Sequence, residues 1–362
     1  MHPEDPADRP VLLAVDGNSL IHRSYHALKH SELRAADGSP TWALKGLLSQ
    51  LVGGVRRVGA DAVVVGLDDS TSNVRKMRYP AYKAHRADKP EDLLVQLAAA
   101  GPLLNAAGVH TVVAPGMEAD DVVASAAAHA AVAGWDTVVM TSDRDAFALV
   151  SDTCKVLRLI NGGVDASPLL NPQRMHILNG VHPHQYRDYA AMRGDTSDNL
   201  PGIRGVGPKS AVKLLAEFDT VEQAFADVDD NDGLRVAKAA GQSMVAKLRD
   251  ADSRAAYRRN VELMTMATDL ELGLALSAVD GAGRLPVAED ALRAALADAQ
   301  LGAIAESAAV ALAHCEPRPR FIQAGPASQG APHPAEAPPA RTRTRATARA
   351  PEPESLQLSL FG

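Results

Sequence analysis

The chain has 362 residues, a formal net charge of −7 and 46% hydrophobic residues, so it can build one large domain or two smaller ones. So acidic a chain does not look like a nucleic-acid binder unless its acidic and basic residues gather in separate places. Two cysteines without metal or disulfide spacing, an acidic N-terminus and no apolar run of ~20 residues favour a cytoplasmic protein over a secreted or membrane protein.

Short apolar runs alternate with helical segments in the first half of the chain. Strands are predicted over 11–15, 62–67, 109–113, 137–141 and 156–160. Helices are predicted from residue 19 and over 41–58, 91–107 and 118–133. Because fully apolar strands suit a sheet that is covered on both faces, the alternation predicts an α/β fold with a parallel sheet.

Acidic residues follow several of these strands. The carboxyl ends of parallel strands share one edge of a sheet, and such folds bind their ligands there. The candidates at this edge are Asp16, Asp68, Glu118, Asp120, Asp121, Asp143 and Asp145, joined by Asp195 and Asp198 from the start of a later helix-like segment. Any one of them is easily read as a helix cap or turn residue, but nine carboxylates in one cleft repel one another unless cations neutralise them. Oxygen ligands select Mg²⁺ or Mn²⁺, and two such ions close together hydrolyse phosphodiesters.

A basic segment follows Asp68. Six Lys and Arg residues lie within residues 75–89, together with Tyr79 and Tyr82. Basic side chains hold phosphates, and tyrosines stack on unpaired bases. A solvated helix face is the usual fate of such a charge run, but its place directly after a candidate metal ligand favours a nucleic-acid contact.

A glycine-rich loop over 201–207 precedes a helix predicted over 208–218, with Pro208 at its first position. Glycines let backbone N–H groups face an anion at the helix N-terminus, most often a nucleic-acid phosphate. No strand precedes the loop, so it is not a dinucleotide fingerprint. A plain helix–turn–helix with two solvated aspartates is the alternative. The candidate DNA contacts here are Gly205, Gly207, Lys209 and Ser210.

The C-terminal part changes character twice. Helices are predicted over 220–270 and 287–313, and the composition of residues 316–354 predicts a disordered linker. Residues 355–362 contain a pentapeptide that resembles the motif with which bacterial replication and repair proteins dock on the sliding clamp. Its apolar anchors and its amide are Leu358, Leu360, Phe361 and Gln357. A chance amphipathic tail is the alternative.

Five motifs within residues 10–275 together resemble the 5′ nuclease (flap endonuclease) family, most closely the 5′→3′ exonuclease domain of bacterial DNA polymerase I. They are VDGNSLIHRSYHA from Val15, YKAHR from Tyr82, GMEADD from Gly116, SDRD from Ser142 and GDTSDNLPGIRGVG from Gly194.

The resemblance implies a domain order. A flexible N-terminus over 1–10 would precede a PIN-like (Rossmann-like) nuclease domain over 11–185, with a helical arch at 70–92. An all-helical helix–three-turn–helix (helix-hairpin-helix) DNA-binding domain would follow over 186–280, then a helical extension over 281–315. No polymerase domain follows residue 300, so a stand-alone nuclease is expected.

The resemblance also implies residue roles. One metal site would be held mainly by Asp16, Asp68, Glu118, Asp120, Asp121 and Asp143, and the second by Asp143 or Asp145 with Asp195 and Asp198. Lys83 and Arg86, at the base of the arch, would steer or polarise the scissile phosphate. Arg23, Arg75, Tyr79 and Tyr82 would contact DNA, and a K⁺ would bind carbonyls near Ile203 and Val206. Val74, Trp42 and Asp69 depart from the family pattern without removing a metal ligand.

The expected function is therefore a divalent-metal-dependent 5′→3′ exonuclease and 5′-flap endonuclease in lagging-strand maturation and repair. Its partners would be DNA with flaps, nicks or overhangs, RNA primer–DNA hybrids and the sliding clamp, and it would be a monomer. Two alternatives stay open: a protein that binds DNA junctions without cleaving them, and a PIN-type ribonuclease for single-stranded RNA.

Overall fold

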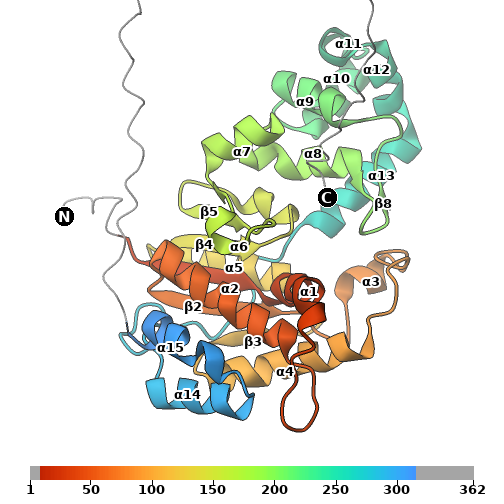
Figure 1. Ribbon diagram of the computed structural model, residues 1–362. Helices are drawn as coiled ribbons and strands as arrows, with labels where there is room; N and C mark the ends of the chain where they lie inside the picture. Colours follow the sequence, from red (N-terminus) through yellow and green to blue (C-terminus); the bar gives the residue numbers. More distant parts are fainter. Residues whose placement is uncertain (1–8, 315–362) are drawn as a thin grey trace, which may run out of the picture. The chain divides into compact units, whose positions relative to one another are not determined.

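The computed structural model describes residues 9–314. Six strands form one sheet in the order β3-β2-β1-β4-β5-β6 (Figure 1). They are β1 (Val11–Asp16), β2 (Ala62–Leu67), β3 (Thr111–Val113), β4 (Asp136–Thr141), β5 (Cys154–Arg158) and β6 (Leu169–Leu170). The first five run parallel, as predicted, and β6 runs antiparallel to β5. The two-residue β6 was not predicted, because so short a strand carries no periodic signal.

Helices cover both faces of the sheet. One face packs against α1 (Gly17–Leu28), α2 (Trp42–Val58), α4 (Glu91–Ala106) and α14 (Glu289–Asp298), and the other against α5 (Ala119–Val132). Within β1, Leu13 lies in the cluster of the first face and Leu12 in that of the second. Alternate side chains of a strand point to opposite faces, so burial on both sides explains why the strands are continuously apolar.

The second half of the described chain is helical. Its longer helices are α7 (Pro172–Asn179), α8 (Tyr186–Arg193), α9 (Pro208–Glu217), α10 (Val221–Asp230), α11 (Leu234–Ala240), α12 (Gln242–Arg249) and α13 (Ala251–Met264). Shorter pieces of the whole chain are η2 (Lys29–Ser31), α3 (Val74–Arg78), η3 (Asp145–Leu149), α6 (Gly163–Ala166), η4 (Pro183–Gln185), η5 (Gly302–Ile304), α15 (Ala305–Ala308) and η6 (Ala309–Ala313).

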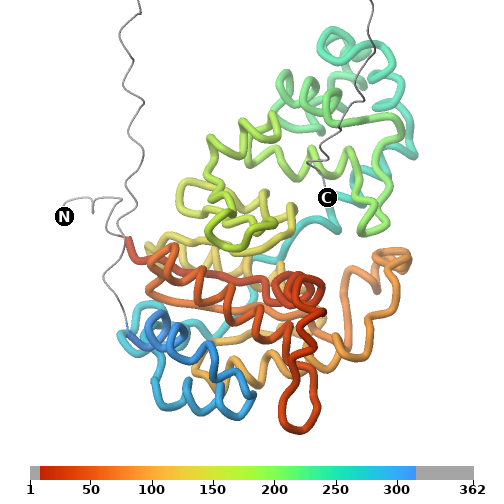
Figure 2. The backbone as a smooth tube through the Cα atoms, viewed as in Figure 1, coloured from red at the N-terminus to blue at the C-terminus, as the bar shows by residue number. Residues whose placement is uncertain are grey.

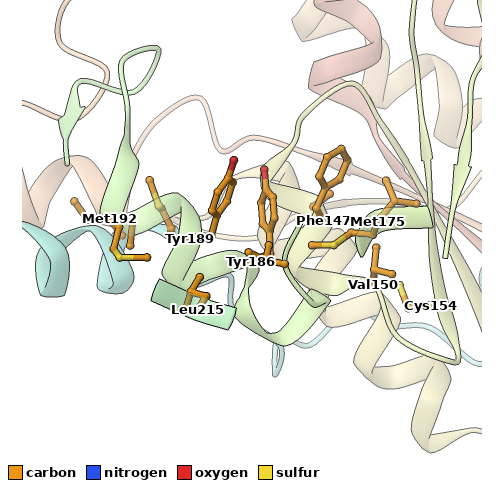
Figure 3. Close-up of a cluster of buried hydrophobic side chains, with 14 of the residues drawn as sticks. Phe147, Val150, Cys154, Met175, Tyr186, Tyr189, Met192 and Leu215 are labelled. Atoms are coloured by element: carbon orange, nitrogen blue, oxygen red, sulfur yellow. The ribbon is translucent and has the colours of Figure 1, made fainter. Parts of the chain in front are cut away.

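One apolar cluster continues from the sheet into these helices. Phe147 of η3 lies against Tyr186 of α8, with ring centroids 5.3 Å apart. Figure 3 shows this stretch, from Cys154 on β5 through Met175 to Leu215 of α9. The helices that follow the sheet are therefore anchored to it through buried side chains, directly beside η3.

The predicted helix over 220–270 is divided into α10 to α13. Gly233 and Gly241 take positive φ values of 71° and 88°, which glycine adopts at little cost, and they start α11 and α12. The carboxylate of Asp227 accepts the N–H groups of Arg235 and Val236 at 3.1 and 3.0 Å and so caps α11.

The helices after residue 288 pack on the sheet domain. Leu292 and Leu296 of α14 are fully buried in the cluster that holds α2 and α4. Of the helices within residues 9–314, none has the length and apolar character to cross a bilayer. The predicted linker over 316–354 and clamp-binding tail over 355–362 lie outside the described residues.

The predicted helical arch over 70–92 is mostly not helical. The five-residue α3 is followed by turns up to Pro90, and Figure 2 shows this stretch as an irregular loop between α3 and α4. Pro80 disfavours helical backbone at Tyr79, whose φ and ψ are −134° and 92°, so α3 ends there. The helix that the family resemblance implied is therefore wrong for most of this segment, because Pro80 ends α3 and the chain continues in turns and irregular backbone up to residue 90.

Candidate active site

Three parallel strands bring aspartates to one edge of the sheet. Asp16 ends β1, Asp68 follows β2 and Asp143 lies two residues beyond β4. Burial raises the pKa of Asp16 to about 7, and the neighbouring carboxylates of Asp143 and Asp68 act in the same direction. The three acids predicted to share an edge are therefore close enough to repel one another.

Helix N-termini hold two of these acids in place. The N–H of Ser19 in α1 donates to Asp16 at 2.9 Å, and the N–H of Ala119 in α5 donates to Asp68 at 2.9 Å. The hydroxyl of Thr141 donates to the second oxygen of Asp16 at 2.7 Å. Such outer contacts orient carboxylates that bind metals. Sequence reasoning missed Thr141, although its place at the end of β4 is a usable signal.

Glu118 holds the basic segment beside the acidic edge of the sheet. It is buried, and its carboxylate accepts bonds from four side chains: Asn73 at 3.0 Å, Arg75 at 2.9 Å, Tyr82 at 2.9 Å and Lys83 at 2.6 Å. Burial by itself would raise the pKa of Glu118, but the cations of Lys83 and Arg75 lower it below its usual range. Glu118 is therefore a charged anchor for residues 73–83.

Arg75 and Asp121 form a buried ion pair, which bears on two predictions. The guanidinium donates to both oxygens of Asp121 at 2.8 Å, and the N–H groups of Glu118 and Ala267 occupy the remaining positions at 3.1 and 2.8 Å. In this arrangement the oxygens of Asp121 are therefore all bonded to protein groups. Arg75 is 8% exposed and cannot reach a DNA phosphate in this arrangement.

The two tyrosines of the basic segment also differ from expectation. Tyr82 is 3% exposed and donates its hydroxyl to Glu118, so its ring has no free face for a base. Tyr79 is half-buried beneath the guanidinium of Arg259, which lies 4.9 Å from the ring centroid. Residue type suggested stacking on DNA, but both rings pack against the protein.

Asp145, Asp195 and Asp198 form a neighbouring group. Burial raises the pKa of Asp145 to about 8, and the carboxylates of Asp143, Asp195 and Asp198 add to this. The prediction that Asp195 and Asp198 begin a helix was wrong. Asp195 lies on β7 (Gly194–Asp195), which pairs with β8 (Leu200–Pro201). Gly194, at φ 72°, ends α8 and turns the chain into this hairpin.

Lys83 lies between Glu118 and Asp198, and Arg86 is paired with Asp198. Arg86 donates to Asp198 at 2.5 Å, and the ammonium of Lys83 lies 3.9 Å from Asp198. The backbone N–H of Lys83 donates to the carbonyl of Asp198 at 2.9 Å, and Asn199 donates to the carbonyl of Ala81 at 2.8 Å. The basic segment is therefore tied to the β7–β8 hairpin.

The nine carboxylates form adjoining groups and do not converge on one metal-binding site. Within residues 9–314, no three His, Cys, Asp or Glu side chains are arranged to hold one metal ion. Arg75, Lys83 and Arg86 take up carboxylate oxygens instead. The remaining set still suits hard divalent cations, since Asp16, Asp68 and Asp120 are oxygen donors whose pKa values are raised by burial and by other acids.

Asp69, which the sequence left without a role, organises a turn. Its two oxygens accept bonds from Thr71, from Ser72 and from the N–H of Gly116, at 2.6 to 2.8 Å. It thus fixes the start of the basic segment to the loop that carries Glu118.

The glycine-rich loop is held from within the protein. The carbonyl of Gly205, at φ 76°, accepts a bond from the ammonium of Lys247 at 2.7 Å. Gly207 caps α9 and exchanges bonds with the hydroxyl of Ser210, while Lys209 is exposed. The carbonyl of Ile203, one of the predicted K⁺ ligands, accepts the N–H of Val206 at 3.0 Å.

Arg23 lies outside these groups and is bonded to the loop after β5. It donates to the carbonyl of Ile160 and lies 3.3 Å from the amide oxygen of Asn161. It is half-buried on α1, so part of its surface remains accessible.

Stability without metal should fall as the pH rises from 6.5 to 8. The folded protein holds protons on Asp16 up to about pH 7 and on Asp145 up to about pH 8, whereas the unfolded chain releases them near 3.8. Burial lowers the pKa of His22 to about 4, so His22 makes stability rise with pH, but this rise is complete above about pH 6.5. In EDTA, the Tm of the wild type should drop across this window and that of Asp16→Asn should drop less. A Tm that stays level or rises would contradict the assignment.

Two family models match the chain. One is described as the 5′-3′ exonuclease N-terminal resolvase-like domain and covers residues 11–176; the other is the 5′-3′ exonuclease C-terminal SAM fold and covers residues 181–284. DNA polymerase I of Mycobacterium tuberculosis is 35% identical over 270 residues, which are 75% of this chain and 28% of that protein. Thermostable DNA polymerase I of Thermus aquaticus is 34% identical over 293 residues, 81% of this chain and 32% of that protein. The chain therefore spans about three tenths of the length of these relatives.

Solved structures share the fold at low identity. A T5 5′-exonuclease with bound divalent zinc has a TM-score of 0.54 and 19% identity over 84% of this chain and 94% of that chain. The bacteriophage T5 D15 flap endonuclease in complex with DNA and metal ions has a TM-score of 0.56 and 20% identity, covering 83% and 99%. Human GEN1 in complex with Holliday junction DNA has a TM-score of 0.53 and 14% identity, covering 84% and 71%.

Proposed function

Because the chain belongs to the 5′-3′ exonuclease family, we propose that it is a divalent-metal-dependent, structure-specific 5′ nuclease that hydrolyses phosphodiesters in DNA. The observation that carries the proposal is the acidic edge of the sheet with two cationic side chains beside it. Asp16, Asp68 and Asp143 supply oxygen donors, and Lys83 and Arg86 supply charge for a phosphate. Carboxylates that hold divalent ions, with cations beside them for a phosphate, suit the hydrolysis of a phosphodiester.

The residues would divide the work by position. Asp16, Asp68, Asp120, Asp143 and one oxygen of Glu118 would hold one divalent ion; Asp145, Asp195 and Asp198, with Asp143, would hold a second. When bound, such ions lower the pKa of a water molecule and neutralise charge on the phosphate.

Lys83 and Arg86 have their own part in the reaction. Lys83 is paired with Glu118, and Arg86 is paired with Asp198. Binding of divalent cations to these carboxylates would release the two basic side chains toward the substrate. There they would neutralise the non-bridging oxygens of the scissile phosphate, whose charge grows in the transition state.

The proposed substrates are duplexes with a 5′ flap, nick or overhang, including RNA primers on DNA. The glycine-rich loop before α9, with Lys209 exposed next to it, would bind the backbone of the duplex. The family and the DNA complexes of proteins that share the fold support this. The task would be primer and flap removal in replication and repair, with delivery by the sliding clamp through residues 357–361.

Substrate preference tests structure specificity. In Mg²⁺, a 5′-flap duplex should be cut at least about tenfold more efficiently than its matching single strand, because only the duplex engages the loop before α9. Values of kcat/KM for the flap, the single strand and a blunt duplex of the same sequence would measure this. A higher value for the single strand, or for the matching RNA strand alone, would favour the single-strand ribonuclease instead.

The other alternative, a junction-binding protein without cleavage, rests on the same fold. The buried carboxylates of Asp16 and Asp145 argue against it, because a protein that only binds junctions does not need acids whose pKa values are raised by burial and by neighbouring carboxylates.

A further inference from the structure

Helix α13 joins the basic segment to the glycine-rich loop. Three of its residues contact residues 75–79: Leu263 through its carbonyl, which accepts from Arg75 at 2.8 Å, Glu262 through a 3.0 Å pair with Arg78, and Arg259 through the Tyr79 ring. No feature of the sequence drew attention to this helix, because its partners lie about 180 residues earlier.

The same helix holds the start of the loop. The amide of Asn260, which is fully buried, donates to the carbonyls of Ala191 and Pro201, both at 3.0 Å. The guanidinium of Arg259 donates to the same carbonyl of Pro201 at 3.1 Å. Arg259 is therefore bonded to the loop on one side and lies over Tyr79, 4.9 Å from the ring centroid, on the other.

Tyr79 is linked through the backbone to the turn that carries the cationic side chains. Its carbonyl accepts the N–H of Tyr82 at 2.8 Å, and Lys83 follows directly with its own N–H on Asp198. Lys83 has a positive φ of 55°, which a residue with a side chain adopts only where its surroundings hold it. The turn that presents Lys83 and Arg86 is thus fixed at one end by the β7–β8 hairpin and at the other by Tyr79 and Arg259.

We propose that Arg259 is a positioning residue that couples duplex binding at the glycine-rich loop to the placement of Lys83 and Arg86. The inference rests on the proposed nuclease function and deepens it. When a bound duplex displaces the loop, the hydrogen bond to Pro201 transmits this displacement to Arg259. The cation–π contact with Tyr79 then transmits it to the turn that carries Lys83 and Arg86. A cation–π contact of this kind favours one placement of the turn over others.

The kinetic test compares Arg259→Met with Arg258→Met. Arg258 is the matched control, because it is the next residue on the same helix but is exposed and paired with Glu222 at 3.2 Å. On a flap duplex, Arg259→Met should lower kcat by about tenfold or more, since small misplacement of reacting groups costs about that much, while KM changes less than about threefold. Arg258→Met should leave both near the wild type.

A double-variant cycle separates coupling from general damage. Tyr79→Leu should lower kcat as much as Arg259→Met does, and the double variant should be no slower than either, because the two changes break one connection. Rates that multiply in the double variant would overturn the proposal. So would a rise in KM at constant kcat, since that identifies Arg259 as a direct phosphate contact.

Limited trypsin digestion tests the coupling without any activity. The basic segment offers exposed cleavage sites after Lys76 and Arg78. Arg259→Met should speed cleavage at these sites at least about threefold relative to Arg258→Met, because the segment loses one of its anchors. Equal digestion rates would overturn the anchoring role. If the wild type cleaves no DNA, the nuclease function fails, and digestion still decides whether Arg259 anchors the segment.

Discussion

Replacing Asp143 with alanine should lower the rate of flap cleavage at least about a thousandfold, which corresponds to about 4 kcal/mol of transition-state stabilisation. The side chain is exposed at the carboxyl end of β4, between the group of Asp16 and Asp68 and the group around Asp145. It is the carboxylate that both groups share, so its loss would weaken both ion sites together. Because it is exposed, the protein should remain folded and should still bind the flap.

Asp152→Ala is the matched control for this prediction. Asp152 is also an exposed aspartate in a turn, but it lies before β5, at the opposite edge of the sheet. Its removal should leave the cleavage rate within about twofold of the wild type, as is usual for a surface change. Comparable loss in both variants, or full activity of Asp143→Ala, would show that the acidic edge does not carry the reaction.

Replacing Arg75 with methionine should destabilise the protein by about 3–5 kcal/mol, the usual cost of removing one partner from a buried ion pair. Methionine fills the space but leaves Asp121 buried without its cation, and Glu118 keeps only the cation of Lys83. The free energy of unfolding from urea titration in EDTA measures this; urea is uncharged and does not screen the pair.

Arg78→Met, on the same helix, provides the comparison. Its partner is Glu262, and both side chains are more than half exposed, so the expected loss is at most about 1 kcal/mol. If both variants lose the same small amount, the Arg75 cluster is not a structural ion pair and its role in DNA contact must be considered again.

Sequence patterns predicted the parallel sheet well, and for a physical reason. Strands buried on both faces need unbroken apolar runs, and ligand-binding acids follow the strand ends, so β1 and Asp16 leave a local signal. The family resemblance placed the second, helical part, which the family models confirm.

What residue type could not show was which charges are satisfied inside the protein. Arg75, Tyr82 and Asp121 carry the right chemistry for DNA and metal. Yet Arg75 bonds to Asp121, and Tyr82 bonds to Glu118, because the chain folds residues 75–82 against α5 and α13. Such pairing depends on contacts between distant segments, which no local pattern records. The same holds for Arg259 and for Lys247, whose ammonium supports the glycine-rich loop.

The most direct test of the account is cleavage of a flap duplex, labelled at its 5′ end, by the wild-type protein in Mg²⁺ and in EDTA. We expect release of a labelled fragment of about the flap's length in Mg²⁺ and none in EDTA, because in the proposed mechanism the carboxylates at the sheet edge would act through divalent ions. Binding of the flap without any cut, in Mg²⁺ or in Mn²⁺, would contradict the account and favour a junction-binding protein.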